Sequence, residues 1–464
     1  VAGSFVFAEV VLIKAVGLGV AIAVALDATV VRALLVPSTM RLLGDRNWWM
    51  PARLRRWIGT RLPVGAALPT LVLSLVAALL LAACSPSGRL LANEPAVQPP
   101  VPVPTPLASR VPDPQPVVLP RDDGAHDRLT EWWYYTGHLK ADDGRSFGFE
   151  YVIFRAERGA FPVAWASHLA ITDEDGDRFL YDQRSEIGPQ VDRSGGAGAD
   201  GASAGADTGS ILDLAIRGEV RPGIPAMDAA PWTIIGGDGS DRLEASGSAG
   251  GAPFGLGLDL DDGDRPVALH DLDGYVDFGP AGGSYYFSRT KMDASGTLTL
   301  DGQELEVAGM AWFDHQWGDF IAVGAGGWDW FAVNLDDGTD FTVSLVRDAA
   351  GGYPLVYGTL VRPDGRVEHL PREAFSVTVT DEWTSEATDA TYPAGWRIEL
   401  PGEDLVVDLV PTVAAQELDT RPTTGVVYWE GSQVVTATRD GLPLGGQAYV
   451  ELTGYGPGSS SQAP

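Results

Sequence analysis

Hydrophobic and polar residues alternate along much of the chain that follows residue 121. A period of two is typical of β-strands that bury one face. The pattern is clearest in two stretches, Phe147-Gly148-Phe149-Glu150-Tyr151-Val152-Ile153 and Trp328-Asp329-Trp330-Phe331-Ala332-Val333-Asn334. We therefore expect a mainly β protein.

Two segments share a longer pattern of aromatic strand, acidic turn and aromatic strand. The first surrounds Asp142-Asp143-Gly144, and the second surrounds Asp336-Asp337-Gly338. Asp-Gly between alternating runs is a strong signal for a hairpin turn. Two related β domains in tandem would produce this repeat, and roughly 340 residues are about twice what one small barrel needs. Chance similarity is the alternative, because Asp-Asp-Gly is common in an acidic, glycine-rich chain.

The chain before residue 85 carries long apolar runs instead. Residues 5–26 and 30–43 are apolar apart from a few charged positions, and an arginine-rich loop follows them. The positive-inside rule places that loop in the cytoplasm. Residues 62–83 carry no charge and end at Leu81-Ala82-Ala83-Cys84. This is the layout of a secretory signal with small residues at its cleavage point.

The sequence Leu81-Ala82-Ala83-Cys84 also resembles a bacterial lipobox, in which the cysteine is acylated and becomes the new N-terminus. Cys84 is the only cysteine, so no intrachain disulfide can form. We expect residues 58–84 to be a lipoprotein signal peptide and Cys84 to anchor the mature protein in the cell membrane. The alternative is an uncleaved transmembrane helix, for which the apolar run is short. Both interpretations export everything after Cys84.

Composition divides the exported part into segments. Residues 85–121 are rich in proline and predict an extended tether. Residues 122–305 and 306–457 are expected to form the first and second domains, and residues 458–464 a disordered tail. Within the first domain, residues 193–210 are almost all Gly, Ala, Ser and Asp, which predicts a mobile insertion.

Charge restricts the class of partner. The chain has a formal net charge of -30 at pH 7 and a sequence pI of about 4.4. Binding to phosphates requires clustered Lys and Arg, so this composition excludes nucleic acid as a partner.

One short segment combines an acid, an imidazole and three large aromatic rings: Trp312-Phe313-Asp314-His315-Gln316-Trp317-Gly318. A carboxyl group among aromatic rings is poorly solvated when charged, so its pKa tends to rise and it can donate a proton near neutral pH. Asp314 is therefore a candidate general acid. The alternative is a structural role, in which its carboxylate caps backbone donors at the domain junction.

Other kinds of chemistry find little support in the sequence. No pair of histidines has metal-ligand spacing, and no Gly-x-Ser-x-Gly elbow occurs. Neither a metal site nor a serine hydrolase is therefore expected, and no cofactor is predicted. His138 and His168 lie in predicted strands, where a hydrogen-bonded histidine of the core or the domain junction is the usual case.

Five motifs occur in order along the second part of the chain. They are Glu131-Trp132-Trp133-Tyr134-Tyr135-Thr136-Gly137-His138-Leu139, Tyr285-Tyr286-Phe287-Ser288-Arg289, the segment from Trp312 to Gly318, Tyr428-Trp429-Glu430-Gly431 and Tyr449-Val450-Glu451-Leu452-Thr453-Gly454-Tyr455. Together they resemble the AttH/carotenoid 1,2-hydratase superfamily, many of whose members are described as lipocalin-like or as predicted secreted hydrolases. The resemblance spans residues 125–456 and implies two tandem lipocalin-like antiparallel β-barrels with a pocket for an apolar ligand.

The resemblance also implies roles for individual residues. In the hydratases of this superfamily the motif Asp protonates an isolated carbon–carbon double bond before water adds, and here that role would fall to Asp314. Tyr285 and Phe287 take the positions of a His and a Trp that support this Asp, and Trp312 takes that of a Tyr. His315 is a candidate substitute, although strand neighbours point to opposite faces unless a bulge intervenes. The expected catalytic residues are Asp314, His315 and Tyr285, and the expected pocket residues are Trp312, Trp317, Trp330, Tyr135 and Phe287.

The first 57 residues contain two further motifs, Leu26-Asp27-Ala28 and Leu43-Gly44-Asp45-Arg46-Asn47-Trp48-Trp49-Met50-Pro51. Mainly through these motifs, residues 1–57 resemble the C-terminal end of MMPL/RND-type lipid transporters. One membrane segment cannot form a proton-driven transporter, whose intramembrane ionisable residues need partners on other helices. Because the chain begins with Val, we expect these residues to be a remnant of a neighbouring lipid transporter gene and the mature product to start at Cys84.

Two functions are consistent with these patterns. The first is an exported, membrane-tethered carrier that binds an apolar lipid, isoprenoid or polyene around residues 312–318. The alternative is a hydratase-like lyase or isomerase that hydrates or rearranges an isoprenoid double bond, with Asp314 as general acid. The transporter-like leader favours the carrier, because it points to lipid traffic at the cell envelope.

Overall fold

The computed structural model describes residues 112–456, apart from residues 160, 195–209, 219–229, 264, 321–325 and 349. The transporter-like segment 1–57 and the signal peptide 58–84 with Cys84 lie outside the described residues, as do the tail 458–464 and most of the tether and the insertion. No helix in the described part has the length and apolar composition that a membrane span requires.

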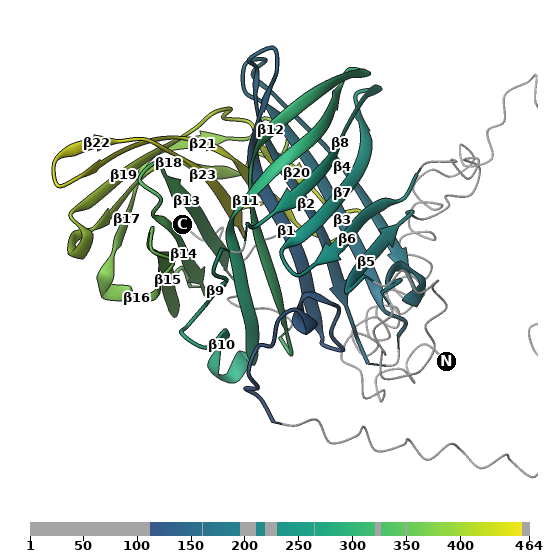
Figure 1. The fold of residues 1–464 in the computed structure, drawn as a ribbon, viewed down its shortest axis with the longest axis horizontal. Helices are drawn as coiled ribbons and strands as arrows, with labels where there is room; N and C mark the ends of the chain where they lie inside the picture. The colour runs from purple at the N-terminus through teal and green to yellow at the C-terminus, as the bar shows by residue number, and fades with distance from the viewer. Residues whose placement is uncertain are drawn as a thin grey trace, which may run out of the picture. The chain divides into compact units, whose positions relative to one another are not determined.

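The described chain forms two antiparallel β-sheets, as the alternating pattern predicts. Figure 1 colours the strands of the first sheet from blue to green and those of the second from green to yellow. The first sheet contains β1 (Thr130–Ala141), β2 (Ser146–Ala156), β3 (Ala164–Asp173), β4 (Arg178–Ile187), β5 (Leu212–Ile216), β6 (Trp232–Gly237), β7 (Ser240–Ala249), β8 (Ala252–Asp261), β9 (Ala268–Leu269), β10 (Tyr275–Asp277), β11 (Gly283–Leu300) and β12 (Gln303–Gly318).

The second sheet follows directly in the chain. It contains β13 (Gly327–Leu335), β14 (Asp340–Arg347), β15 (Leu355–Val361), β16 (Val367–Pro371), β17 (Ser376–Thr384), β18 (Thr391–Leu400), β19 (Leu405–Pro411), β20 (Glu417–Asp419), β21 (Val427–Arg439), β22 (Leu442–Leu444) and β23 (Gly446–Thr453). A short 3₁₀ turn, η4 (Arg121–Asp123), precedes β1, and others lie between strands, at η5 (Pro189–Val191), η6 (Gly279–Ala281), η7 (Arg372–Ala374) and η8 (Pro401–Glu403).

The two sheets share one strand order, which explains the repeat in the sequence. The first runs β4-β3-β2-β1-β12-β11-β8-β7-β6-β5, and the second runs β16-β15-β14-β13-β23-β21-β19-β18-β17. The repeated segments are the equivalent hairpins β1–β2 and β13–β14. Their turns contain Gly144 at φ +95° and Gly338 at φ +86°, a backbone region that favours glycine. The predicted hairpins are thus confirmed.

Each sheet curls around a hydrophobic core of its own. In the first sheet, Asp182 on β4 accepts a hydrogen bond of 3.1 Å from the backbone nitrogen of Ser248 on β7, which draws distant strands together. The expected class, two lipocalin-like units of mainly β structure, is confirmed.

The position of β12 corrects the expected division of the chain. This strand pairs along its length with both β1 and β11, so the first sheet extends to Gly318. A boundary between residues 305 and 306 would cut through β12. The Trp312–Gly318 segment therefore belongs to the first unit, because its partners are strands of that unit.

The outer faces of the two sheets meet in a contact that we call the junction. It is formed by β1, β2, β11 and β12 of the first sheet and β13, β21 and β23 of the second, and one buried cluster contains Tyr134 and Trp312 together with Trp330 and Tyr449. The strands approach closely at Gly148, where a Cβ atom would lie 2.8 Å from Cβ of Ser432. The junction brings polar side chains of both sheets out of contact with water.

Candidate active site at the junction of the two sheets

Strand β12 presents Asp314 and His315 to different surroundings. Its alternation places Phe313 and Trp317 in the core of the first sheet and Trp312 at the junction. Asp314 follows Trp312 at the junction, whereas His315 stacks on Trp133 inside the first sheet, with ring centroids 4.8 Å apart. The junction is therefore the place where an acid meets aromatic side chains of both sheets.

Asp314 is almost fully buried, with 3% of its surface exposed, and it accepts three hydrogen bonds. Tyr286 donates its hydroxyl to Oδ2 at 2.5 Å, and Trp312 donates Nε1 to Oδ1 at 2.6 Å. The hydroxyl of Ser288 donates to the same Oδ1. Trp330 of the second sheet donates Nε1 to the Tyr286 oxygen at 3.1 Å, so both sheets contribute to the arrangement.

A buried histidine extends this network on the Ser288 side. His270 lies 2.7 Å from the Ser288 oxygen through Nε2 and 2.8 Å from the Thr359 oxygen through Nδ1. Burial lowers the pKa of His270 to about 3, so the ring is neutral. Because Ser288 donates to Asp314, we assign the ring proton to Nε2, which donates to Ser288, while Nδ1 accepts from Thr359. Every donor in the network thus points toward the carboxylate of Asp314.

Two opposed effects set the acidity of Asp314. Burial disfavours the charged carboxylate, and it raises the pKa of Asp314 to about 6 despite the three hydrogen bonds that stabilise the ionised form. A carboxyl group with such a pKa is partly protonated near neutral pH and can act as a general acid.

A small pocket lies beside this acid. The space that a water molecule can occupy in it is about 10 Å³, roughly the room for a single water and far below the roughly 300–1,000 Å³ typical of drug-sized ligands. The Trp312 side chain connects the pocket to Asp314, because it lines the pocket and donates a hydrogen bond to Asp314. The lining residues are Thr136, Gly137, His138, Met310, Trp312, Ala332, Asn334 and Tyr449.

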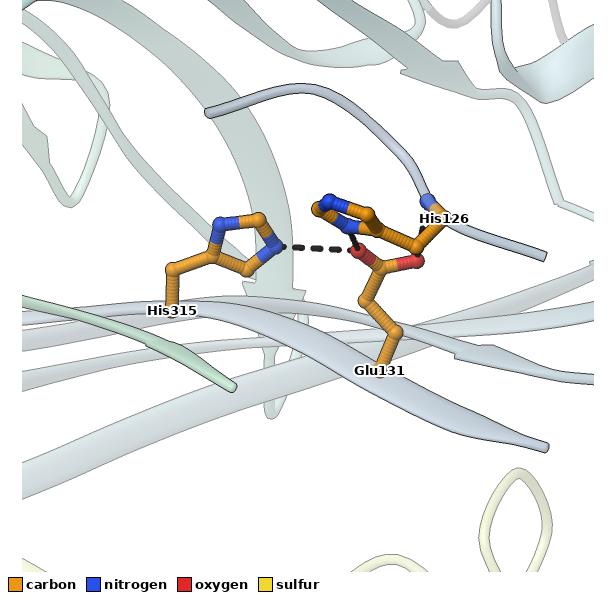
Figure 2. Close-up of side chains that lie close together, drawn as sticks. All are labelled: His126, Glu131 and His315. Carbon is orange, nitrogen blue, oxygen red and sulfur yellow. Dashed lines mark hydrogen bonds and ion pairs between the residues drawn. The ribbon is translucent and has the colours of Figure 1, made fainter. Parts of the chain in front are cut away.

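A second polar cluster lies inside the first sheet, away from the junction. Figure 2 shows His126 and His315 on either side of the Glu131 carboxylate. Oε1 of Glu131 lies 2.7 Å from Nδ1 of His126 and 3.0 Å from Nε2 of His315, and Oε2 accepts the backbone N–H of His126 at 2.9 Å. Burial opposes ionisation of Glu131, but the charge and hydrogen bond of His126, with those of His315, outweigh it and lower the pKa of Glu131 to about 2.

These three side chains are the residue types that bind zinc, and their ligand atoms lie within 4.8 Å of one another. Their fit to a metal is nevertheless poor. His315 is fully buried and its Nδ1 has no hydrogen-bond partner among the described residues. A metal on Nε2 would move the ring proton to Nδ1 and leave a buried N–H unpaired, which is costly. The cluster is better described as a hydrogen-bonded ion pair between Glu131 and His126.

The structure corrects several expected site residues. Ser288 on β11 lies opposite Asp314, so Tyr286 and Ser288 contact the acid, not Tyr285 and Phe287. Tyr285 instead donates its hydroxyl to Asp113 at 2.7 Å. The physical reason is the strand period of two, which turns residues 285 and 287 to the opposite face.

The expected pocket residues divide in the same way. Trp312 lines the pocket, and Trp330 packs against it at the junction, with ring centroids 6.1 Å apart and planes at 81°. Tyr135, Phe287 and Trp317 belong to the core of the first sheet, where Trp317 also stacks on His126 at 4.1 Å. His315 is likewise in that core, so it cannot replace the missing support of Asp314.

Sequence reasoning did not single out Tyr286, Ser288 and His270 as partners of Asp314, nor Glu131 as a partner of His315. The sequence contained a signal for Tyr286 and Ser288. Once the residue of β11 opposite Asp314 is known, the strand period of two determines which other residues of β11 share the face of Asp314. His270 offered no local signal, since it reaches Ser288 only through the fold. His138 and His168 lie at the junction, as expected: the His138 ring packs edge-on against Tyr449 of the second sheet, with centroids 5.9 Å apart, and His168 hydrogen bonds to Tyr428 of that sheet at 2.7 Å. His138 also lines the pocket.

The fold and the site together define a class of protein: two lipocalin-like sheets that enclose a buried acid at their junction. A family model described as AttH-like matches residues 110–455, and the chain belongs to that family.

Solved structures share this architecture. A candidate AttH protein from Nitrosomonas europaea is 29% identical, with a TM-score of 0.60 over 75% of this chain and 99% of that chain. Kievitone hydratase from Nectria haematococca is 16% identical, with a TM-score of 0.52 over 73% of this chain and 93% of that chain, and this likeness concerns the fold alone.

A separate similarity concerns a short segment. Over 65 residues the chain is 52% identical to the trehalose monomycolate exporter MmpL3 of Mycobacterium tuberculosis. The match covers 14% of this chain and 7% of the exporter. The expected resemblances to the AttH superfamily and to an MMPL-type transporter are both confirmed.

Proposed function

We propose that the protein binds an apolar molecule with an isolated carbon–carbon double bond at the junction and hydrates or isomerises it, with Asp314 as general acid. The observation that carries this proposal is the state of Asp314, a carboxyl buried among aromatic rings with a pKa raised to about 6 by that burial. Such an acid can transfer a proton to an alkene, which is a very weak base. An ionised carboxylate has no proton to transfer.

The surroundings of Asp314 suit both products of that proton transfer. The carboxylate that remains is stabilised by Tyr286, Ser288 and Trp312, whose donors are already aligned before the proton leaves. The carbocation would lie near the faces of Trp312, Trp330 and Tyr134, and Tyr134 packs edge-on against Trp330 at 5.4 Å. Aromatic faces stabilise cations, by about 0.5–2 kcal/mol each.

A second candidate function is a non-catalytic carrier of an apolar ligand. It is favoured by the hydrogen bonds that occupy both oxygens of Asp314, because a structural carboxylate would be satisfied in the same way. In this case the junction would bind and release a ligand unchanged.

Replacing Asp314 with Asn separates the two functions, because Asn keeps the shape but cannot deliver a proton. Ligand binding is measured by quenching of tryptophan fluorescence, and turnover by mass spectrometry of the recovered ligand. We expect Asp314→Asn to bind within about threefold of the wild type and to lose turnover by at least 10²-fold. The matched control is Glu304→Gln, an exposed acid on the same strand. Turnover by Asp314→Asn at the wild-type rate would reject the enzyme.

We also propose that the protein acts outside the cytoplasm and is held at the cell membrane through Cys84. The support is the sequence Leu81-Ala82-Ala83-Cys84 at the end of an uncharged run. Mass analysis of the N-terminus in the membrane fraction tests this, and a Cys84→Ala variant should leave that fraction. A mature protein that retains Trp48 and Trp49 would contradict the proposal.

A further inference from the structure

His270 connects the buried acid of the first sheet to the second sheet. It directly follows β9, and Nε2 of its ring lies 2.7 Å from the hydroxyl oxygen of Ser288, which donates to Asp314. On the other side of the ring, Nδ1 lies 2.8 Å from the hydroxyl oxygen of Thr359 on β15. An unbroken line of hydrogen bonds therefore runs from Asp314 to the second sheet.

Several contacts fix the position of the His270 ring. It stacks on the ring of Tyr286, with centroids 3.8 Å apart and planes at 27°, and its backbone N–H donates to the carbonyl oxygen of Tyr286 at 3.2 Å. His270, Ser288 and Thr359 are each at most 2% exposed. Because the ring is held in this way, each of its nitrogens keeps one fixed partner.

The outer end of the line lies near the edge of the second sheet. Thr359 is directly opposite His369 on the edge strand β16. Directly opposite residues of an antiparallel pair share one face, with Cβ atoms about 4.5–5.5 Å apart. His369 and Asp271 are both partly exposed, and Nδ1 of His369 lies 3.5 Å from Oδ1 of Asp271. Ionisable side chains in contact with water thus lie beside the outer end of the line.

His270 has the protonation state that suits proton transfer along this line. Burial, and after it the charge of nearby His369, lower the pKa of His270 to about 3, so the ring carries one proton and one free lone pair. A neutral imidazole can accept a proton at one nitrogen while it releases a proton from the other. The ring can therefore pass a proton inward without storing a positive charge.

The proposed chemistry requires such a supply of protons. Asp314 becomes ionised each time it protonates an alkene, and it must regain a proton before the next turnover. It is only 3% exposed, so solvent has little direct access to its carboxylate.

We propose that Thr359, His270 and Ser288 form a relay that carries protons from solvent at the edge of the second sheet, near His369, to Asp314. This inference rests on the proposed function of Asp314 as a general acid. Its geometrical basis is the hydrogen-bonded line itself, in which both nitrogens of one buried ring have hydroxyl partners.

The transfer balances at every position of the relay. A hydronium ion or buffer acid gives a proton to the oxygen of Thr359, whose own hydroxyl proton moves to Nδ1 of His270. The proton on Nε2 of His270 moves to Ser288, and the hydroxyl proton of Ser288 moves to Oδ1 of Asp314. Each relay group gains one proton and loses one, so only Asp314 changes, from carboxylate to carboxylic acid.

Exchange of the Asp314 proton with deuterated water tests the relay without any substrate. At pH 5, below the pKa of about 6, Asp314 is protonated, and infrared spectroscopy after rapid mixing follows the shift of its carboxyl band on deuteration. The band of Asp314 is the one missing from the spectrum of Asp314→Asn. We expect His270→Gln and Thr359→Val to slow this exchange by at least about tenfold, because neither an amide nor a methyl group passes a proton.

Thr342→Val is the matched control. Thr342 lies opposite Thr359 on β14 and is equally buried, but its hydroxyl has no hydrogen-bond partner among the described residues. This variant should exchange the Asp314 proton at the wild-type rate.

The direction of the effect separates a relay from a structural role. Damage to the fold would open the junction and speed up exchange, whereas loss of the relay slows it. Exchange within about twofold of the wild type in either His270→Gln or Thr359→Val would overturn the relay and leave the role of Asp314 intact. That role is tested separately by the turnover of Asp314→Asn. Slowed exchange in both variants of a protein without turnover would support the relay and reject the alkene chemistry.

Discussion

Asp314 and His315 are neighbours on β12 but face different interiors, the first the junction and the second the core of the first sheet. The strand period of two imposes this division. The acid and the imidazole therefore belong to separate networks. Asp314 accepts from tyrosine, serine and tryptophan donors, whereas His315 hydrogen bonds to Glu131, which is ion-paired with His126. Changes at the two positions should have separable effects, on reaction and on stability.

Activity should fall as pH rises through about 6, because the reaction needs protonated Asp314. Above that pH, kcat/KM should decrease about tenfold per pH unit. Tyr286→Phe removes one hydrogen-bond donor that favours the ionised form of Asp314. It should therefore move the fall in kcat/KM about 1–2 pH units higher. The pH–rate profile of the purified protein measures both effects, and a profile unchanged by Tyr286→Phe would contradict the role of that hydrogen bond.

Glu131→Gln should lower the free energy of unfolding by about 3 kcal/mol at pH 7, because it breaks a buried ion pair. The pKa of Glu131 is lowered to about 2, so its contribution is present above the unfolded value of about 4.3 and disappears as pH falls toward about 2. Urea denaturation at pH 7 and at pH 3 measures the difference. Glu304→Gln should change stability by less than about 0.5 kcal/mol at either pH, and an equal loss in both variants would exclude this explanation.

The junction should weaken in alkali, because it brings Glu150 of β2 close to Glu430 and Glu451, which lie opposite each other on β21 and β23. The pKa values of Glu150 and Glu451 are raised to about 8 and about 7, above the unfolded value of about 4.3. Stability that is present at low pH is therefore lost as pH rises through 7 and 8, when the acids ionise and repel one another. Between pH 6 and pH 9 the thermal midpoint should drop on the order of 5 °C more in the wild type than in Glu430→Gln. Parallel curves for the two proteins would show that the cluster does not titrate in this range.

Zinc should not stabilise the protein through His126, Glu131 and His315. A chelator should leave the thermal midpoint unchanged, and added zinc should shift it by less than about 2 °C, because no described residue accepts a proton displaced to Nδ1 of His315. Differential scanning calorimetry with and without zinc is the measurement. A stabilisation by zinc that disappears in Glu131→Gln would instead establish a metal site.

The sequence was sufficient for the architecture, because strands such as β2 and β13 carry an alternating pattern and most hairpin turns contain a glycine. The repeat around Gly144 and Gly338 even pointed to the equivalent hairpins of the two sheets. The boundary between the two sheets was harder to predict. The alternation in β12 cannot indicate that its partners are β1 and β11, since pairing across the chain depends on tertiary contacts.

The site was only partly predictable, again because the pairing of distant strands is not evident in the sequence. Local chemistry identified Asp314 and its aromatic neighbours, but the choice of Tyr285 and Phe287 required the register of β11, and the bulge between Arg289 and Met292 obscures any count from the strand end. The acids at 150, 430 and 451 lay within predicted strands or quoted motifs, yet nothing local shows that they meet.

The shared strand order has a consequence for biosynthesis. In each unit the opening strand pairs with a strand made much later: Thr130 with Gly318 in the first, and Leu335 with Gly446 in the second. Neither sheet can complete its central pairing until the distant strand has emerged, and contacts so far apart in sequence make for slow folding. The first unit can nevertheless finish while the second is still being translated, so the junction, and the acid it buries, would be the last part of the molecule to form.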